Sequence, residues 1–121
     1  MGIYRTLGCA DYDTGSRPER PVVELSVTGP VTGREATFRA AADTGFSGFL
    51  LVPRDTYQEF SEVELPAKDF LTYRTVVGPL VLRRARIIAM MQAKRFETFI
   101  ETPLAGIGKF LIGRRILNML Q

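Results

Sequence analysis

The sequence of 121 residues contains no histidine, and it contains a single cysteine, Cys9. Without histidine, the chain cannot form a Ser-His-Asp triad, a Cys-His pair or a histidine-ligated metal site. A lone cysteine excludes an internal disulfide and is typical of a reducing compartment, so we expect a cytoplasmic location. Acid–base chemistry must therefore come from the 13 carboxylates, or from lysine, tyrosine or the one cysteine.

Long apolar runs and a strong charge bias are also missing. The longest stretch without a charged residue, 44–53, has ten residues, which is too short to cross a membrane as a helix. The start of the chain lacks the basic and apolar pattern of a secretory signal. The net charge is only +3, and clusters such as Arg83-Arg84-Arg86 fall in alternating segments typical of a solvated strand face. We therefore expect neither a membrane nor a nucleic-acid partner.

Alternating apolar residues predict a mostly-β domain with six or seven short strands. Val23, Leu25 and Val27 illustrate the pattern, because they share one face of an extended segment. A short helix is expected at 54–60, and a better one follows Gly113 at the end of the chain. We expect turns at Gly78-Pro79 and at 92–94. The expected strands are residues 21–27, 34–42, 48–52, 70–77, 80–91, 96–100 and 104–112.

Asp43 is the main candidate for chemistry. It follows three alanines and precedes Thr44-Gly45 and an apolar run, so its carboxylate is expected to be partly buried. Such burial costs several kcal/mol unless the carboxylate is hydrogen-bonded or paired, and nearby glycines allow backbone amides to approach it. An ordinary Asx turn between two strands would explain the same residues. A second Asp-Thr-Gly, at Asp13, has polar flanks, and we interpret it as a turn.

Three segments in order resemble a retropepsin-like aspartic protease, the single-domain branch of the pepsin superfamily. Arg20-Pro21-Val22-Val23 resembles the first core strand, and Ala42-Asp43-Thr44-Gly45 resembles the catalytic loop. Leu111-Ile112-Gly113-Arg114 resembles the segment that supports this loop, and Phe46-Ser47-Gly48 is most similar to prokaryotic members. The resemblance implies a small closed β-barrel of the retropepsin type with one short C-terminal helix. The protease domain would span 20–121, after an N-terminal arm, 1–19, that could contact the partner of a dimer.

The resemblance also implies a role for each matching residue. Asp43 would be catalytic, Thr44 would bond across to the partner's loop, and Gly45 would offer its amide to the carboxylate. Arg114 would hold the loop through charge-assisted bonds. The loop-supporting residues are Thr44, Gly45, Ile112, Gly113 and Arg114, and the residues expected to bind substrate are Phe46, Ser47, Tyr73, Val76 and Val77. No metal or cofactor is implied.

Three positions depart from the family pattern. Phe46 replaces a small residue, and Ser47 stands where retroviral enzymes carry an acid that pairs with the helix arginine. The candidate flap, 72–79, has one glycine where relatives often have several. A stiff flap would weaken closure over substrate.

Two hypotheses follow from this sequence. The first is an aspartic endopeptidase that cleaves an extended peptide or protein substrate at a homodimer interface, with Asp43 from each subunit. The alternative is a catalytically weak or silent retropepsin-fold module that dimerises or binds peptides. Cleavage of an unfolded substrate would distinguish the two.

Overall fold

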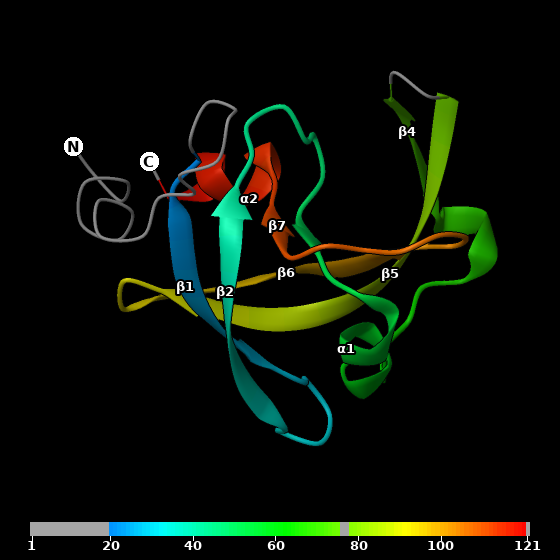
Figure 1. Ribbon diagram of the computed structural model, residues 1–121. Coiled ribbons are helices and arrows are strands. Elements are labelled where there is room, and N and C mark those ends of the chain that lie inside the picture. Colours follow the sequence, from blue (N-terminus) through cyan, green and yellow to red (C-terminus); the bar gives the residue numbers. More distant parts are fainter. Residues whose placement is uncertain (1–19, 76–77, 121) are drawn as a thin grey trace.

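The structure is a computed structural model that describes residues 20–75 and 78–120, and the expected arm 1–19 lies outside this part of the chain. Within the described ranges the chain forms seven strands, two α-helices and one 3-10 turn (Figure 1). In chain order they are β1 (Val22–Thr28), β2 (Glu35–Ala42), β3 (Leu50–Leu51), α1 (Arg54–Glu59), η2 (Ala67–Asp69), β4 (Leu71–Thr75), β5 (Gly78–Met91), β6 (Lys94–Pro103), β7 (Leu111–Ile112) and α2 (Arg114–Met119). The expected mostly-β class is confirmed.

All strands belong to one sheet with the order β1-β2-β7-β3-β6-β5-β4. An additional pairing of β1 with β5 makes six of these strands a ring, and β4 extends from β5 beyond it. Strand β7 lies between β2, to which it is parallel, and β3, to which it is antiparallel. This insertion places the loop that follows β2 directly beside the residues that follow β7.

The interior of the ring is filled by the alternating apolar residues. Val23, Leu25 and Val27 are buried on one face of β1, as expected. Apolar side chains of both helices, among them Tyr57 and Ile116, complete the same cluster, whose burial is the main driving force for folding. The buried cluster consists of Val23, Leu25, Val27, Ala40, Ala42, Leu50, Val52, Tyr57, Phe60, Ala85, Ile87, Ala89, Met91, Ile100, Ile112, Ile116 and Leu117.

The expected turn at Gly78-Pro79 is wrong, because both residues lie within β5. Gly78 pairs with Thr75 and Pro79 pairs with Arg74, so β4 and β5 form a hairpin whose connection is residues 76–77. Strand β5 pairs with β6 only from Leu82 onward. Pro79 therefore lies where β5 has a neighbour on one side only, and its missing N–H does not interrupt a central ladder.

Two expected strands are shorter in the structure. The run 48–52 pairs only at Leu50–Leu51, and the segment 104–112 pairs only at Leu111–Ile112. Gly106 has a φ of 98°, a backbone conformation that favours glycine and ends extended pairing. The described chain has two six-residue helices, α1 and α2, which confirms the helices predicted at 54–60 and after Gly113. The resemblance implied only the C-terminal one.

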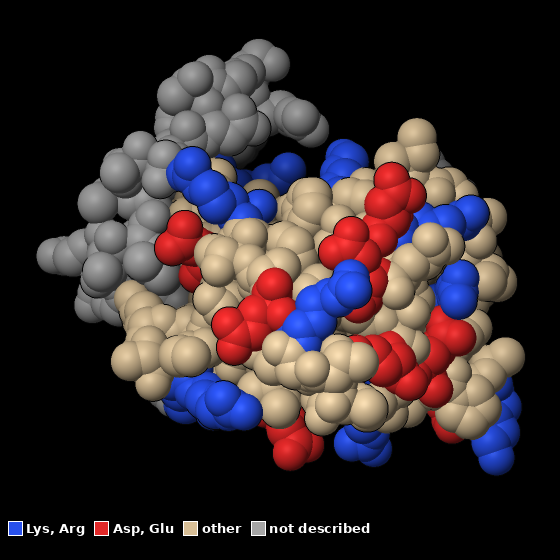
Figure 2. Space-filling view, turned by 90° about the horizontal axis from the view of Figure 1, so that it is seen from below, with Lys and Arg blue, Asp and Glu red and all other residues tan. Residues whose placement is uncertain are grey.

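On the face shown in Figure 2, lysine and arginine side chains are interspersed with aspartate and glutamate. No helix in the described part of the chain is long and apolar enough to span a membrane.

Candidate active site

Asp43 begins the loop that follows β2, and backbone hydrogen bonds fix its position. Its N–H donates to the carbonyl of Ile112 at 2.9 Å, and its own carbonyl accepts from the N–H of Phe46 at 3.1 Å. The Gly45 N–H donates to Asp43 Oδ1 at 2.9 Å, so the expected amide contact is confirmed. A Cβ at position 45 would lie 3.2 Å from the same oxygen. Glycine therefore leaves room beside the carboxylate.

The residues after β7 support this loop from the other side. Gly113, Arg114 and Arg115 donate their N–H groups to the carbonyls of Phe49, Phe46 and Gly48 at 2.6, 2.8 and 3.2 Å. A Cβ at position 113 would lie 2.6 Å from the Gly48 carbonyl carbon and closer still to its oxygen. Position 113 thus accommodates only glycine without displacing the loop.

Arg114 contacts the loop through its backbone. Its residue is exposed, and its guanidinium forms no ion pair with the described residues. Its N–H donates to the Phe46 carbonyl at 2.8 Å, and the charge-assisted role implied by the resemblance remains a prediction. Ser47 is half-buried and does not line the cavity described below.

Arg20 forms an ion pair with Asp43 that sequence reasoning missed. Its Nη1 donates to Asp43 Oδ2 at 2.8 Å, and the two side chains are 37% and 24% exposed. The signal is the register of β1 against β2, in which Val22 pairs with Ala41. Because β1 and β2 are antiparallel, the residue two before Val22 lies opposite the residue two after Ala41. Continuing the register therefore brings Arg20 opposite Asp43.

A cavity of about 530 Å³ opens at the carboxylate of Asp43. Its walls come from the Asp43 loop, from β3 and β7, and from the β4–β5 hairpin. The lining is apolar except for two opposite charges, those of Asp43 and Arg74. The lining residues are Asp43, Gly45, Phe46, Leu51, Arg74, Leu80 and Leu111.

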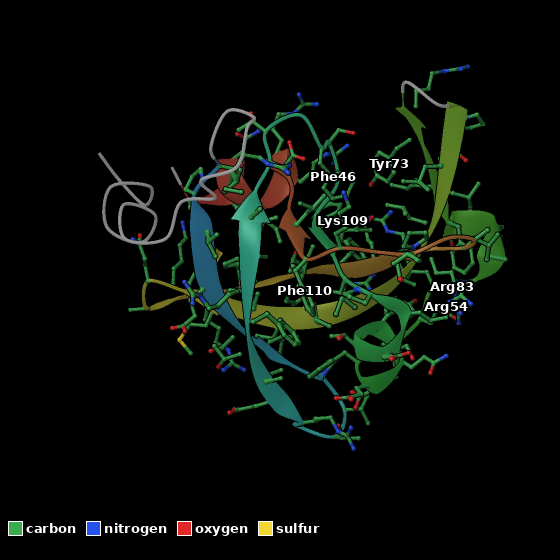
Figure 3. All side chains as sticks on the ribbon, viewed as in Figure 1. Phe46, Arg54, Tyr73, Arg83, Lys109 and Phe110 are labelled. Carbon is green, nitrogen blue, oxygen red and sulfur yellow. The ribbon has the colours of Figure 1, made fainter. Side chains whose placement is uncertain are left out.

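Phe46 and Tyr73 join the loop to the hairpin beside this cavity. Their ring centroids are 5.6 Å apart, and Figure 3 shows the two side chains facing each other between the loop and β4. Phe46 lines the cavity, and its contact with substrate remains a prediction. Tyr73 does not line the cavity, and its hydroxyl donates to Glu101 Oε2 at 3.1 Å, so its contact with substrate remains a prediction. Val76 and Val77, the other expected flap contacts, lie outside the described residues.

Thr44 is exposed at the surface of the loop, and its predicted bond to a partner's loop remains a prediction.

Within residues 20–75 and 78–120, no three Asp, Glu, Cys or His side chains gather in a way that could hold a metal ion. The Asp43 carboxylate accepts one backbone amide, that of Gly45, and pairs with the Arg20 guanidinium.

Glu101 is the second residue near the site that sequence reasoning missed. It is fully buried on β6 and contacts both the Asp43 loop and the hairpin. Burial raises the pKa of its carboxyl, against the opposing effects of the Phe49 amide and the Tyr73 hydroxyl. In the structure Glu101 belongs to a stretch of four buried residues, 100–103, at the end of β6. The sequence gives no signal that distinguishes this stretch from an ordinary strand.

No protein-family model matches the sequence, and no curated protein matches it.

Proposed function

We propose that the chain is an aspartic endopeptidase that acts as a homodimer, with Asp43 of each subunit at one shared site. The observation that carries this proposal is the placement of the Asp43 carboxylate. It lies at the opening of a largely apolar cavity and is held by the Gly45 amide. The loop that carries it is clamped by Gly113 at the start of α2. In this proposal the ring of paired strands is the closed barrel of retropepsin-like enzymes.

The chemistry follows from bringing two such carboxylates together. Two carboxylates about 3 Å apart cannot both be ionised, so the pair holds one proton, which is characteristic of aspartic proteases. The ionised Asp43 takes a proton from a water molecule, whose oxygen attacks the carbonyl carbon of the peptide. The protonated Asp43 of the partner subunit donates its proton to the carbonyl oxygen. Collapse of the resulting diol returns a proton to the leaving amine. These steps require no histidine.

The Arg20 ion pair must give way before this pair can form. Arg20 occupies Oδ2, while Oδ1 accepts the Gly45 amide. Because both partners are partly exposed, the ion pair is worth less than about 1 kcal/mol. Loss of the ion pair therefore adds little to the cost of bringing a second carboxylate, with its shared proton, beside Asp43.

The same ion pair favours a second candidate function, a catalytically silent module that dimerises or binds peptides. If Arg20 keeps its place in the dimer, it occupies Asp43 Oδ2, so the two carboxylates cannot pair and the site activates no water. The variant Arg20→Gln distinguishes the two functions. In the protease, wild type cleaves peptide and Arg20→Gln retains or increases that cleavage. In the module silenced by Arg20, wild type does not cleave, and only Arg20→Gln can gain activity.

The direct test compares wild type with Asp43→Asn on denatured casein between pH 3 and 7. We expect a bell-shaped pH dependence with its maximum on the acid side of neutrality, because the two limbs belong to one coupled pair of carboxylates. Asp43→Asn should abolish cleavage and leave the fold intact. Asp13→Asn is the matched control, since it alters the other Asp-Thr-Gly sequence and should have no effect. Cleavage by Asp43→Asn at the wild-type rate would refute the assignment.

Subunit mixing tests the shared site. If wild type and Asp43→Asn exchange subunits in equal amounts, about one quarter of the dimers are wild-type pairs, and activity per total chain falls to roughly that fraction. If each chain carried a complete site, roughly half would remain. Activity should also fall faster than linearly on dilution through the dimer dissociation constant. Retention of half of the activity, with exchange confirmed by mass spectrometry, is incompatible with a shared site.

A further inference from the structure

A fully buried carboxylate lies beneath the site and belongs to none of the proposed chemical steps. Glu101 Oε1 accepts the Phe49 N–H at 2.9 Å, and Glu101 Oε2 accepts the Tyr73 hydroxyl at 3.1 Å. Phe49 ends the segment that Gly113 clamps, and Tyr73 lies on β4 of the hairpin. One side chain on β6 therefore joins two segments, the Asp43 loop and the hairpin, that each contribute residues to the wall of the cavity.

The surroundings of Glu101 leave little freedom for the loop above it. A Cβ at position 48 would lie 2.7 Å from Glu101 Oε1, so the backbone at Gly48 passes directly over the carboxylate. The ring of Tyr73 packs against Phe46, which itself lines the cavity. Burial and the nearby Glu101 carboxylate raise the pKa of Tyr73, so its hydroxyl remains a donor over the working pH range. The hairpin and the loop are thus held at two adjacent points.

Arg84 supplies the charge that accompanies Glu101. Its Nε lies 3.8 Å from Glu101 Oε2, and its guanidinium carbon lies 4.0 Å from the Phe99 ring centroid and 5.2 Å from that of Phe49. Arg84 is 8% exposed, and its Nε donates to no described residue. A buried ion pair of this kind contributes little net stability, because desolvation offsets the attraction. An apolar pair of similar volume would stabilise the fold at least as well. The Glu101–Arg84 pair is therefore better explained by the positions in which Glu101 holds the hairpin and the loop.

We propose that Glu101 is a positioning residue, whose two oxygens tie the Tyr73 hairpin to the Phe49 loop and so hold the hairpin over the cavity that contains Asp43. The role in substrate binding rests on the proposed protease function, whereas the tie itself does not. It fixes the distance between the hairpin wall, with Arg74 and Leu80, and the Asp43 loop.

A second Tyr–Glu–Arg group in the same chain provides a matched control. The Tyr57 hydroxyl donates to Glu64 Oε2 at 2.7 Å, and Arg83 Nε donates to the same oxygen at 2.8 Å. Neither Tyr57 nor Glu64 lines the cavity. Tyr57→Phe and Tyr73→Phe each remove one hydroxyl that donates to a carboxylate, so they should lose similar stability.

The experiment compares wild type, Tyr73→Phe and Tyr57→Phe by hydrogen–deuterium exchange and by peptide cleavage. We expect Tyr73→Phe to speed amide exchange in β4 and in residues 78–82, and to raise KM about tenfold with a smaller change in kcat. Tyr57→Phe should change neither. Glu101→Gln, which cannot accept both hydrogen bonds through one amide oxygen, should shift exchange and KM in the same direction as Tyr73→Phe.

Three results overturn the inference. They are unchanged exchange in Tyr73→Phe, equal exchange and KM effects in Tyr57→Phe, and faster exchange with an unchanged KM. If wild type cleaves no peptide, the proposed function fails, but hydrogen exchange still decides whether Glu101 ties the hairpin to the loop.

Discussion

Replacing Gly113 by alanine should both destabilise the protein and inactivate the site. The added Cβ would lie 2.6 Å from the Gly48 carbonyl carbon and 2.8 Å from Phe46 Cδ2. Packed carbon atoms are roughly 3.5–4.0 Å apart, so the start of α2 and the Asp43 loop must separate by about 1 Å. That movement weakens the three hydrogen bonds that Gly113, Arg114 and Arg115 donate to the loop.

The expected cost follows from those three bonds. Each contributes about 1 kcal/mol, which gives a loss of about 3 kcal/mol. Alanine restricts the unfolded chain and returns about 0.5 kcal/mol. The net loss of about 2–3 kcal/mol corresponds to a fall in Tm of roughly 10 °C for a domain of this size. Urea unfolding followed by circular dichroism measures the free energy, and cleavage of denatured casein below the unfolding transition measures activity.

Gly108→Ala is the matched control. Its Cβ would lie 2.9 Å from the Val52 carbonyl carbon and closer still to its oxygen, so it also meets a backbone carbonyl. Neither Gly108 nor Val52 lines the cavity. We therefore expect Gly108→Ala to lose comparable stability and to retain activity when folded. A loss below about 0.5 kcal/mol for Gly113→Ala, or equal inactivation by both variants, would refute the reasoning.

The remaining predictions concern pH and one turn. Because burial raises the pKa of Glu101 in the folded protein, its contribution to stability is present below the ordinary carboxyl pKa and is lost as pH rises through the raised value. The free energy of unfolding of wild type minus that of Glu101→Gln should therefore fall as pH rises above the ordinary carboxyl range, which urea titrations at each pH will measure. Glu64 should behave in the opposite way. Its burial opposes ionisation, but hydrogen bonds from Arg83 and Tyr57 leave the pKa lowered, so the wild-type advantage over Glu64→Gln is lost as pH falls. Ala93 joins β5 to β6 with a φ of 65°, so Ala93→Gly should raise the unfolding free energy by about 0.5 kcal/mol, and no gain in Tm would contradict this.

The sequence alone determined the local features of the fold and of the site. The alternation of Val23, Leu25 and Val27 predicted which face of β1 is buried, because side chains alternate strictly along a strand. The flanks of Asp43 marked it as a half-buried turn residue, and Gly45 was expected to offer its amide. These features depend on neighbours within a few residues, so a single sequence is enough to predict them.

Only the tertiary structure decided which distant groups meet. Arg20 reaches Asp43 through the register of β1 against β2, and Glu101 accepts from Phe49 and Tyr73, which are 52 and 28 residues away in the chain. The pairing of β4 with β5 likewise places Gly78 within a strand, where the sequence had predicted a turn. The physical reason is that apolar and polar patterning decides whether a residue is buried, whereas the register between strands decides what it touches. A glutamate in a strand pattern is expected at the surface, and only the crossing of the hairpin and the loop over β6 makes Glu101 a buried acceptor.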